Sequence, residues 1–151
     1  MRVGILSDTH GLLRPQVLAL LAGCERLLHA GDVGDAAILD ALRRVAPVEA
    51  VRGNVDQGPG LDRLPHTVSG QLGELPFGMV HRREEVPPDW PRRLRLIVCG
   101  HSHRPELEWD GRCLLLNPGA CGQRRFQLPL TLAIVTVDGD RITPEIRAVE
   151  P

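Results

Sequence analysis

Five short apolar segments of this chain are each followed by a turn that carries side chains able to bind a metal ion. The first segment covers residues 2–6, and the last covers residues 94–99 and ends at Gly100. Ligands bind at the carboxyl ends of the strands in open α/β sheets, so this repeated pattern predicts one shared site at a sheet edge. The side chains concerned are, in chain order, Asp8, His10, Asp32, Asn54, His81, His101 and His103.

The first half of the chain alternates strand patterns with helix patterns. A strand–helix–strand–helix–strand order requires parallel pairing with right-handed crossovers. Asp35 is a good N-cap, because its short carboxylate can accept a hydrogen bond from the first turn of the helix that follows. The predicted strands cover residues 2–6, 26–30 and 47–51, and the predicted helices run from Pro15 to Gly23 and over residues 36–45.

The second half is dominated by strand patterns. Residues 56–66 are rich in Gly and Pro and form a predicted surface loop, and residues 82–93 leave room for one helical turn. The two halves together predict the α/β class: an αββα layered sandwich of two packed β-sheets flanked by helices, in a single domain over residues 1–151. The predicted strands here are 67–72, 75–80, 94–99, a hairpin around Asp110 and Gly111, 130–137 and 141–148.

Composition argues against several classes of function. The formal net charge is −1 over 151 residues, so neither a basic nucleic-acid groove nor contact with an anionic membrane is expected. Phe and Trp are scarce and Tyr is absent, which weighs against modules built to stack nucleic-acid bases. There is no signal-peptide pattern, and no apolar run approaches the ~20 residues that span a bilayer. We therefore expect a soluble cytoplasmic protein whose four cysteines are free thiols.

Each metal-capable side chain, taken alone, has a structural alternative. Gly-Asp and Gly-Asn pairs are common in turns, and Asp8 with His10 could be a turn residue beside a surface histidine. The argument for a site is a joint one, since five successive strand ends each place such a side chain early in the following loop. His29 and His66 fall outside this pattern, and we expect both to be structural.

The types of ligand limit the metal. Carboxylate, amide and imidazole groups without thiolate suit manganese, iron, nickel, cobalt or zinc, and argue against copper(I) and calcium. A carboxylate shared by two ions fits a centre with metals ~3.5–4 Å apart, the separation used in phosphoryl displacement. We expect two divalent metal ions, with manganese as the first choice.

Six short motifs occur in order along the chain: Ser7-Asp8-Thr9-His10-Gly11, His29-Ala30-Gly31-Asp32, Gly53-Asn54-Val55-Asp56, Val80-His81, Gly100-His101-Ser102-His103 and Asn117-Pro118-Gly119. They resemble the motifs of the calcineurin-like metallophosphoesterase superfamily. Within it, the chain is most similar to the small single-domain phosphodiesterases of bacteria and archaea. The resemblance extends over nearly the whole chain.

The resemblance implies a dinuclear centre in which a hydroxide that bridges both metals attacks phosphorus and the metals neutralise the developing charge. It also implies a role for each of the seven residues. One metal would be held by Asp8, His10 and His103, the other by Asn54, His81 and His101, and Asp32 would bridge the two ions.

The chain departs from the family pattern at three places near this site. Many members carry a histidine directly after the metal-binding asparagine, where it protonates the leaving group. Val55 occupies that position here, as in a small branch of the family that favours activated diesters. The loop often written His-Gly-His contains Arg82 and Arg83 after the first histidine, and Ala120 replaces the serine that often follows Asn-Pro-Gly.

Arginines near these loops could supply cationic donors to a phosphate. Arg82, Arg83 and Arg125 are predicted to bind substrate, with Arg124 as a further candidate. The alternative for each is a solvated surface arginine. If a poor leaving group does receive a proton, the candidates are Asp56 and a water held by Arg82 or Arg83.

The sequence thus predicts a metal-dependent phosphodiesterase that hydrolyses small phosphodiesters. A phosphomonoesterase or a nucleotide pyrophosphatase is the enzymatic alternative. The alternative of another class is a non-catalytic protein-binding scaffold, like the retromer subunit of eukaryotes that resembles this fold. The complete set of seven ligands favours an enzyme. Neither a membrane nor specific nucleic-acid binding is expected, and the sequence leaves the oligomeric state open, a homo-oligomer included.

Overall fold

One five-stranded sheet joins the parallel strands of the first half to the last two strands of the chain. Its order is β10-β9-β1-β2-β3, in which β1, β2 and β3 run parallel and β9 pairs antiparallel with β1. This places β1 in the middle of the sheet. The bounds in this computed structural model, which describes residues 1–150, are β1 Arg2–Leu6, β2 Arg26–His29, β3 Val48–Ala50, β9 Thr131–Asp138 and β10 Arg141–Ala148.

The second sheet is formed by the middle of the chain. Its order is β4-β5-β6-β8-β7, with β5, β6 and β8 parallel and with β4 and β7 as antiparallel edge strands. The predicted hairpin at Asp110 and Gly111 therefore connects an edge strand to an inner one. The bounds are β4 Thr67–Leu72, β5 Leu75–Val80, β6 Leu96–Val98, β7 Pro105–Asp110 and β8 Cys113–Pro118.

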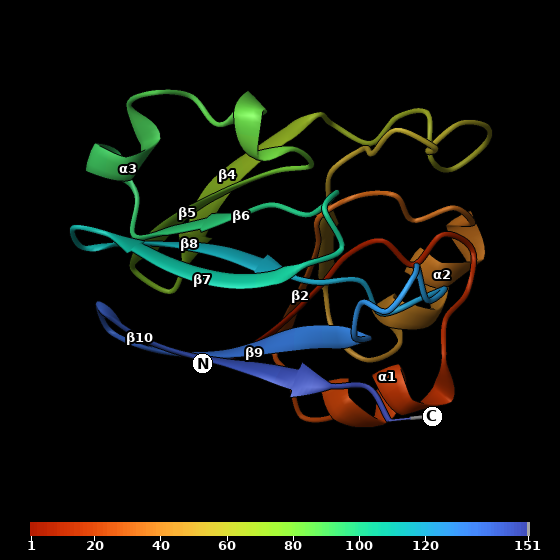
Figure 1. Cartoon of the computed structure of the whole chain (residues 1–151). Coiled ribbons are helices and arrows are strands. Elements are labelled where there is room, and N and C mark those ends of the chain that lie inside the picture. Colours follow the sequence, from red (N-terminus) through yellow and green to blue (C-terminus); the bar gives the residue numbers. More distant parts are fainter. Residues whose placement is uncertain (151) are drawn as a thin grey trace.

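The two sheets pack face to face and enclose the main core (Figure 1). This core draws on β1, β2 and β9 from the first sheet and on β5, β6 and β8 from the second. Ile5 and Phe77, from opposite sheets, are both fully buried in it. Because side chains alternate along a strand, Leu6 and Leu27 point to the other face of the first sheet, where they meet the helices.

Helices cover the outer faces of both sheets, which confirms the αββα order. Helices α1 (Pro15–Leu21) and α2 (Ala36–Arg43) pack on the first sheet. Asp35 caps α2 as predicted, since its carboxylate accepts a hydrogen bond of 2.9 Å from the Ala37 N–H. The segment 82–93 forms a 3₁₀ turn, η1 (Arg83–Glu85), and a short helix, α3 (Trp90–Arg93), where the sequence predicts a single turn.

The observed strands differ from the predicted ones mainly in length. The largest difference is β6, which forms only at Leu96–Val98, because Leu94 caps the end of α3. All four cysteines are free and buried. Within residues 1–150, no helix combines the length and the apolar character needed to cross a membrane.

Candidate metal centre

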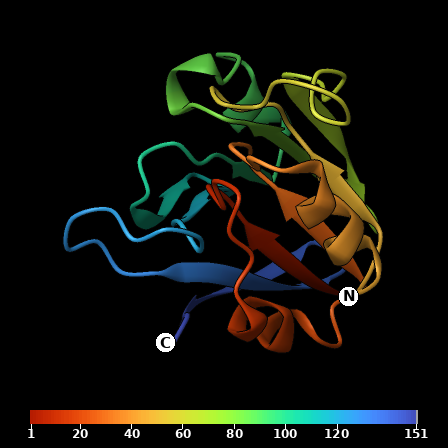
Figure 2. The ribbon, with the colours of Figure 1, turned by 90° about the vertical axis from the view of Figure 1, so that its right-hand side faces the viewer.

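The loops that follow β1, β2, β3, β5 and β6 gather at one end of the sandwich, on the right in Figure 1 and toward the viewer in Figure 2. Six of the seven predicted side chains form two compact groups there. Within each group, one ligand atom from each residue lies within 4.8 Å of the others. The first group is Asp8, His10 and His103, and the second is Asp32, His81 and His101.

Asp32 stands between the two groups. Its Oδ2 lies 3.1 Å from Nε2 of His81 in its own group and 3.6 Å from Nε2 of His10 in the other. The same His10 nitrogen is 3.6 Å from Oδ1 of Asp8, which lies 3.5 Å from Nε2 of His103. One carboxylate is therefore close to ligand atoms of both groups.

Four buried polar atoms at this site lack a hydrogen-bond partner among the described residues. They are Oδ1 of Asp8, Nε2 of His10, Nε2 of His81 and Nδ1 of His103. Buried polar atoms in proteins nearly always have a hydrogen-bond partner, because a buried atom without one destabilises the fold by its full desolvation free energy. Carboxylate oxygens and imidazole nitrogens that converge without partners fit divalent metal ions well.

The other polar atoms of the two aspartates are already engaged. Oδ2 of Asp8 accepts a hydrogen bond of 2.6 Å from the Ser7 hydroxyl and one of 3.1 Å from the His101 N–H. Oδ1 of Asp32 accepts one of 3.1 Å from the Val55 N–H. Each carboxylate is thus held through one oxygen and presents the other to the site.

His81 is oriented in a similar way. Its Nδ1 lies 2.7 Å from the Ala30 carbonyl oxygen, which can only accept, so Nδ1 carries the proton. Nε2 is therefore the ring nitrogen that faces the site, 3.1 Å from Oδ2 of Asp32. Histidine ligands of metals commonly donate their second ring N–H to a carbonyl or carboxylate in this manner.

The backbone at the site adopts a conformation that side-chain-bearing residues seldom take. Non-glycine residues with positive φ cost ~1–3 kcal/mol each and are concentrated at functional sites. Five of the seven predicted ligands have positive φ: Asp8 at 57°, His10 at 46°, Asp32 at 57°, His101 at 72° and His103 at 63°.

Two glycines allow these loops to approach one another. A Cβ on Gly53 would lie 2.2 Å from both the backbone nitrogen and Oδ1 of Asp32, and one on Gly100 would lie 2.1 Å from Oγ of Ser7. Any side chain at either position would push the loops apart.

The charges of the site shift the pKa values of its histidines in opposite directions. The carboxylate of Asp8 raises the pKa of His10 against the effect of burial. Burial lowers the pKa of His81, but the neighbouring Asp32 outweighs it and the net pKa is raised. Burial dominates at His103 and lowers its pKa. At Asp32, burial raises the pKa, but His81 and the Val55 N–H outweigh it and hold the carboxylate ionised.

Comparison with known proteins assigns the chain to a family. The model of the calcineurin-like phosphoesterase superfamily domain matches residues 1–140. This chain belongs to that superfamily. Its members use divalent metal ions, as the groups of candidate ligands lead one to expect.

Similar proteins of this superfamily come from archaea and bacteria. A probable metallophosphoesterase of Methanothermobacter thermautotrophicus is 29% identical over 160 residues, which cover 97% of this chain and 91% of the relative. One from Methanocaldococcus jannaschii is 31% identical over 134 residues, which cover 80% of this chain and 68% of the relative.

Solved structures of the same fold include proteins with different names. An archaeal phosphodiesterase superposes with a TM-score of 0.81 at 21% identity, covering 97% of this chain and 100% of its own. Wild-type Vps29 of Entamoeba histolytica in complex with Zn²⁺ superposes with a TM-score of 0.75 at 22% identity, covering 99% and 100%. At these identities the likeness concerns the fold, and the fold alone does not separate the two.

The superfamily motif Gly53-Asn54-Val55-Asp56 supplies more than a ligand. The Asp56 carboxylate is fully buried and accepts hydrogen bonds from the backbone N–H groups of Asp32 at 3.0 Å, Gly53 at 2.7 Å and Gly34 at 3.1 Å. It therefore fastens the Asp32 loop to the Asn54 loop. The expectation that Asp56 could protonate a leaving group is wrong, because this carboxylate faces the backbone and is out of contact with solvent.

His29, in the superfamily segment His29-Ala30-Gly31-Asp32, ties the first two loops together. The Gly31 N–H donates to its Nδ1 at 3.1 Å, so Nε2 carries the proton and donates to Oγ1 of Thr9 at 3.1 Å. The Thr9 hydroxyl in turn donates to the Val33 carbonyl at 2.8 Å. Complete burial lowers the pKa of His29 to about 4, so the ring is neutral near pH 7.

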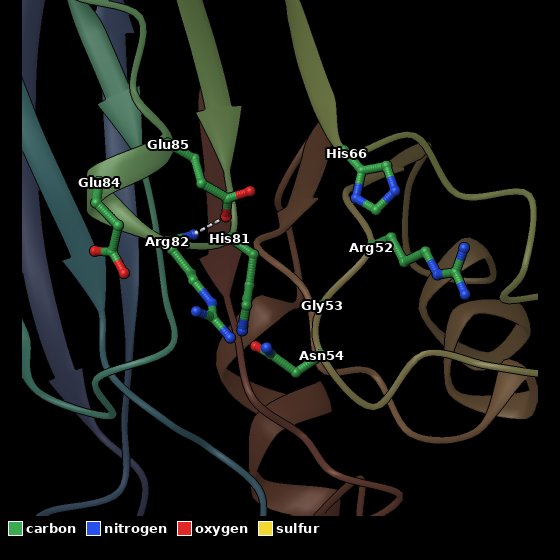
Figure 3. Close-up of a pocket in the computed structure, with 8 residues that line it drawn as sticks. All are labelled: Arg52, Gly53, Asn54, His66, His81, Arg82, Glu84 and Glu85. Atoms are coloured by element: carbon green, nitrogen blue, oxygen red, sulfur yellow. Dashed lines mark hydrogen bonds between the residues drawn. The ribbon is translucent and has the colours of Figure 1, made fainter.

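A cavity of about 530 Å³ opens beside the second ligand group (Figure 3). Asn54 lies at its edge next to His81, and the Arg82 side chain extends toward the same point. Arg52 and His66 line the opposite wall. His66 thus lines the same cavity as Asn54, which its position in a Gly- and Pro-rich loop gave no signal to predict.

Arg125 and Arg83 have different surroundings. A smaller cavity of about 150 Å³ beside the first ligand group is lined by Arg124 and Arg125 together with His10 and His103. The Arg83 guanidinium instead lies 2.6 Å from Glu108 and 3.7 Å from Glu106, both on β7. Arg82 and Arg125 therefore flank the ligand groups from two sides. Arg83 lines a third cavity, of about 200 Å³, with His101, but its guanidinium is paired with acidic residues.

Proposed function

We propose that this protein is a dinuclear metal-dependent phosphodiesterase that hydrolyses small phosphodiesters. The observation that carries the proposal is the set of four unpartnered buried ligand atoms at this site. Two of them, Nε2 of His10 and Nε2 of His81, lie 3.6 Å and 3.1 Å from Oδ2 of Asp32. One ion would be held by Asp8, His10 and His103, and Asp32 would be shared. Asn54, His81 and His101 would hold the other.

Two divalent ions at these positions would supply a water of lowered pKa and Lewis-acid neutralisation of charge on the phosphoryl oxygens. The protein's own groups do the rest. Arg82, beside Asn54, and Arg125, beside His10, reach an anionic substrate from two sides and hold its phosphate by charge-assisted hydrogen bonds. His29 and Asp56 keep the three ligand loops at fixed distances, so that little reorganisation is needed during the reaction.

The leaving group determines which diesters are good substrates. Val55 is 47% exposed at the position where many family members carry the proton-donating histidine, and its side chain has no proton to donate. Since Asp56 is buried against the backbone, it does not replace that histidine. We therefore expect activated diesters to react well and alkyl diesters poorly.

Two alternatives remain to be separated by experiment. A phosphomonoesterase or nucleotide pyrophosphatase would use the same ligands and differ in the cavities around them. A non-catalytic scaffold would have no need for five ligand residues with a strained backbone, three of which also carry unpartnered buried atoms. This strain favours an enzyme, because it costs stability without improving the packing.

Metal analysis followed by an activity panel tests the proposal. The purified protein is analysed for metal content, stripped with a chelator and reloaded separately with manganese, nickel, iron, cobalt or zinc. We expect two ions per chain, the highest activity with manganese, and hydrolysis of bis(4-nitrophenyl) phosphate in preference to 4-nitrophenyl phosphate. Preference for the monoester would support the enzymatic alternative. Binding of two ions without any hydrolysis would support the scaffold.

A further inference from the structure

We propose that Phe126 forms the floor of a subsite for an aromatic arm of the substrate, a nucleoside or aryl group, next to the Asp8–His10–His103 group. The inference rests on the proposed function and names the class of diester that this site selects. Its basis is the combination of an exposed aromatic ring, a strained backbone and a cleft whose lining residues Arg104 and Phe126 directly follow His103 and Arg125 of the cavity at the ligand group.

Phe126 is unusual in this chain. Its side chain is 88% exposed, the highest value among the large hydrophobic residues described, whereas Phe77 is fully buried and Trp90 nearly so. The chain contains only two phenylalanines and two tryptophans. Leaving one of these aromatic rings exposed to water therefore forgoes a large share of the aromatic surface that could be buried in the core. The backbone of Phe126 also has a φ of 54°, which a bulky residue rarely adopts without a compensating contact.

The position of Phe126 connects it to the first ligand group. Arg125, the preceding residue, lines the cavity that contains His10 and His103. Phe126 itself lines a wider cleft of about 690 Å³ with Leu128 and with Arg104, which directly follows His103. The loop of residues 120–130 projects to the left in Figure 2, and Figure 1 shows it at the end of the sandwich that carries the ligand loops. A diester with its phosphate at the ligand groups can therefore extend its organic arm over Phe126.

The chemistry of the cleft suits an aromatic group linked to a phosphate. Bases stack on exposed aromatic side chains whatever their sequence, because every base has a π-face. Leu128 adds apolar contact, while Arg104 and Arg125 place positive charge near an anionic ester. One exposed ring provides room for a single aromatic arm, which agrees with the expectation from the net charge of −1 that the protein does not bind a nucleic-acid strand.

Two diesters with the same leaving group test the proposal. They are the 4-nitrophenyl ester of thymidine 5′-monophosphate and methyl 4-nitrophenyl phosphate, assayed with the manganese-loaded enzyme. We expect kcat/KM to favour the nucleoside diester, and Phe126→Ala to reduce that preference by about five- to 150-fold. Phe126→Trp should retain it, because tryptophan also offers a stacking face. Trp109→Ala, which removes an exposed aromatic residue on β7, serves as the matched control and should keep the wild-type ratio.

Each outcome of this experiment has a defined meaning. If Phe126→Ala leaves the ratio of kcat/KM for the two diesters unchanged, the proposal is overturned. This includes the case in which the variant loses activity equally on both substrates. Equal losses together with a smaller mass in light scattering would show that Phe126 lies between copies of the chain. If the wild-type protein hydrolyses neither diester, the proposed function fails, but calorimetric titration with thymidine 5′-monophosphate and methyl phosphate still tests the subsite. In this titration, the subsite is supported if Phe126→Ala binds thymidine 5′-monophosphate more weakly than the wild type but binds methyl phosphate equally well. The subsite is overturned if the wild type and the variant bind the nucleotide equally.

Discussion

His29 provides a stability test with a definite sign, because it is completely buried and its pKa is lowered by burial to about 4, from an ordinary 6.5. The unfolded chain takes up a proton at this histidine as the pH falls below 6.5, whereas the folded protein resists until about pH 4. Its contribution to folding is therefore complete above pH 6.5 and is lost as the pH falls toward 4. At about 1.4 kcal/mol per pH unit, the loss totals about 3 kcal/mol, of which about 2 kcal/mol falls between pH 7 and pH 5.

The measurement is urea unfolding of the metal-free protein between pH 7 and pH 5, for the wild type and for His29→Gln. The variant is less stable at every pH, because it loses the hydrogen bonds to Gly31 and Thr9. The decisive quantity is how the difference in unfolding free energy between the wild type and His29→Gln changes with pH. The histidines of the metal centre contribute equally to both proteins, so their effect cancels in this difference. We expect the gap to narrow by about 2 kcal/mol as the pH falls from 7 to 5. His66→Gln, at an exposed histidine, should keep the wild-type slope. A gap that stays constant would refute the account of His29 as a neutral, buried link.

Four further outcomes follow from the site. Asp32→Asn should abolish hydrolysis and lower the metal content, since Asp32 is the carboxylate near both groups; near-normal turnover would remove the dinuclear proposal. Anomalous diffraction should show that His101→Ala loses the ion next to His81 and that His103→Ala loses the other; a reversed loss would overturn the assignment. Asp56→Ala leaves three buried N–H groups unpaired and should lower the free energy of unfolding in urea by ~3–9 kcal/mol, at ~1–3 kcal/mol each; a loss below 1 kcal/mol would show that the link made by Asp56 between the two loops is unimportant. In a series of phenyl diesters, log rate should fall steeply with leaving-group pKa, and Val55→His should flatten the slope; a flat wild-type plot with chemistry rate-limiting would show that another group supplies the proton.

Much of the fold follows from local patterns that are visible in the sequence. Strand and helix periods depend on residues close together in the chain, so β1, β5 and α2 form where the apolar pattern and Asp35 predict them. The candidate ligands could be named for the same reason, because strand ends in a parallel sheet meet at one edge. The division of these ligands into two groups was suggested by the resemblance of the ordered motifs to those of the superfamily.

The sequence by itself therefore determined the layers, the ligand types and the edge at which they meet, while the tertiary structure decided how the side chains face one another. The positive φ values of Asp8 and His101 are imposed by contacts between loops far apart in the chain, and no local pattern encodes them. In the same way Arg83 forms an ion pair with Glu108 on a distant strand, and the Asp56 carboxylate is engaged by three backbone N–H groups. The physical reason is that the direction of a loop side chain depends on which distant groups satisfy its charge and hydrogen bonds, and those partners are known only once the chain has folded.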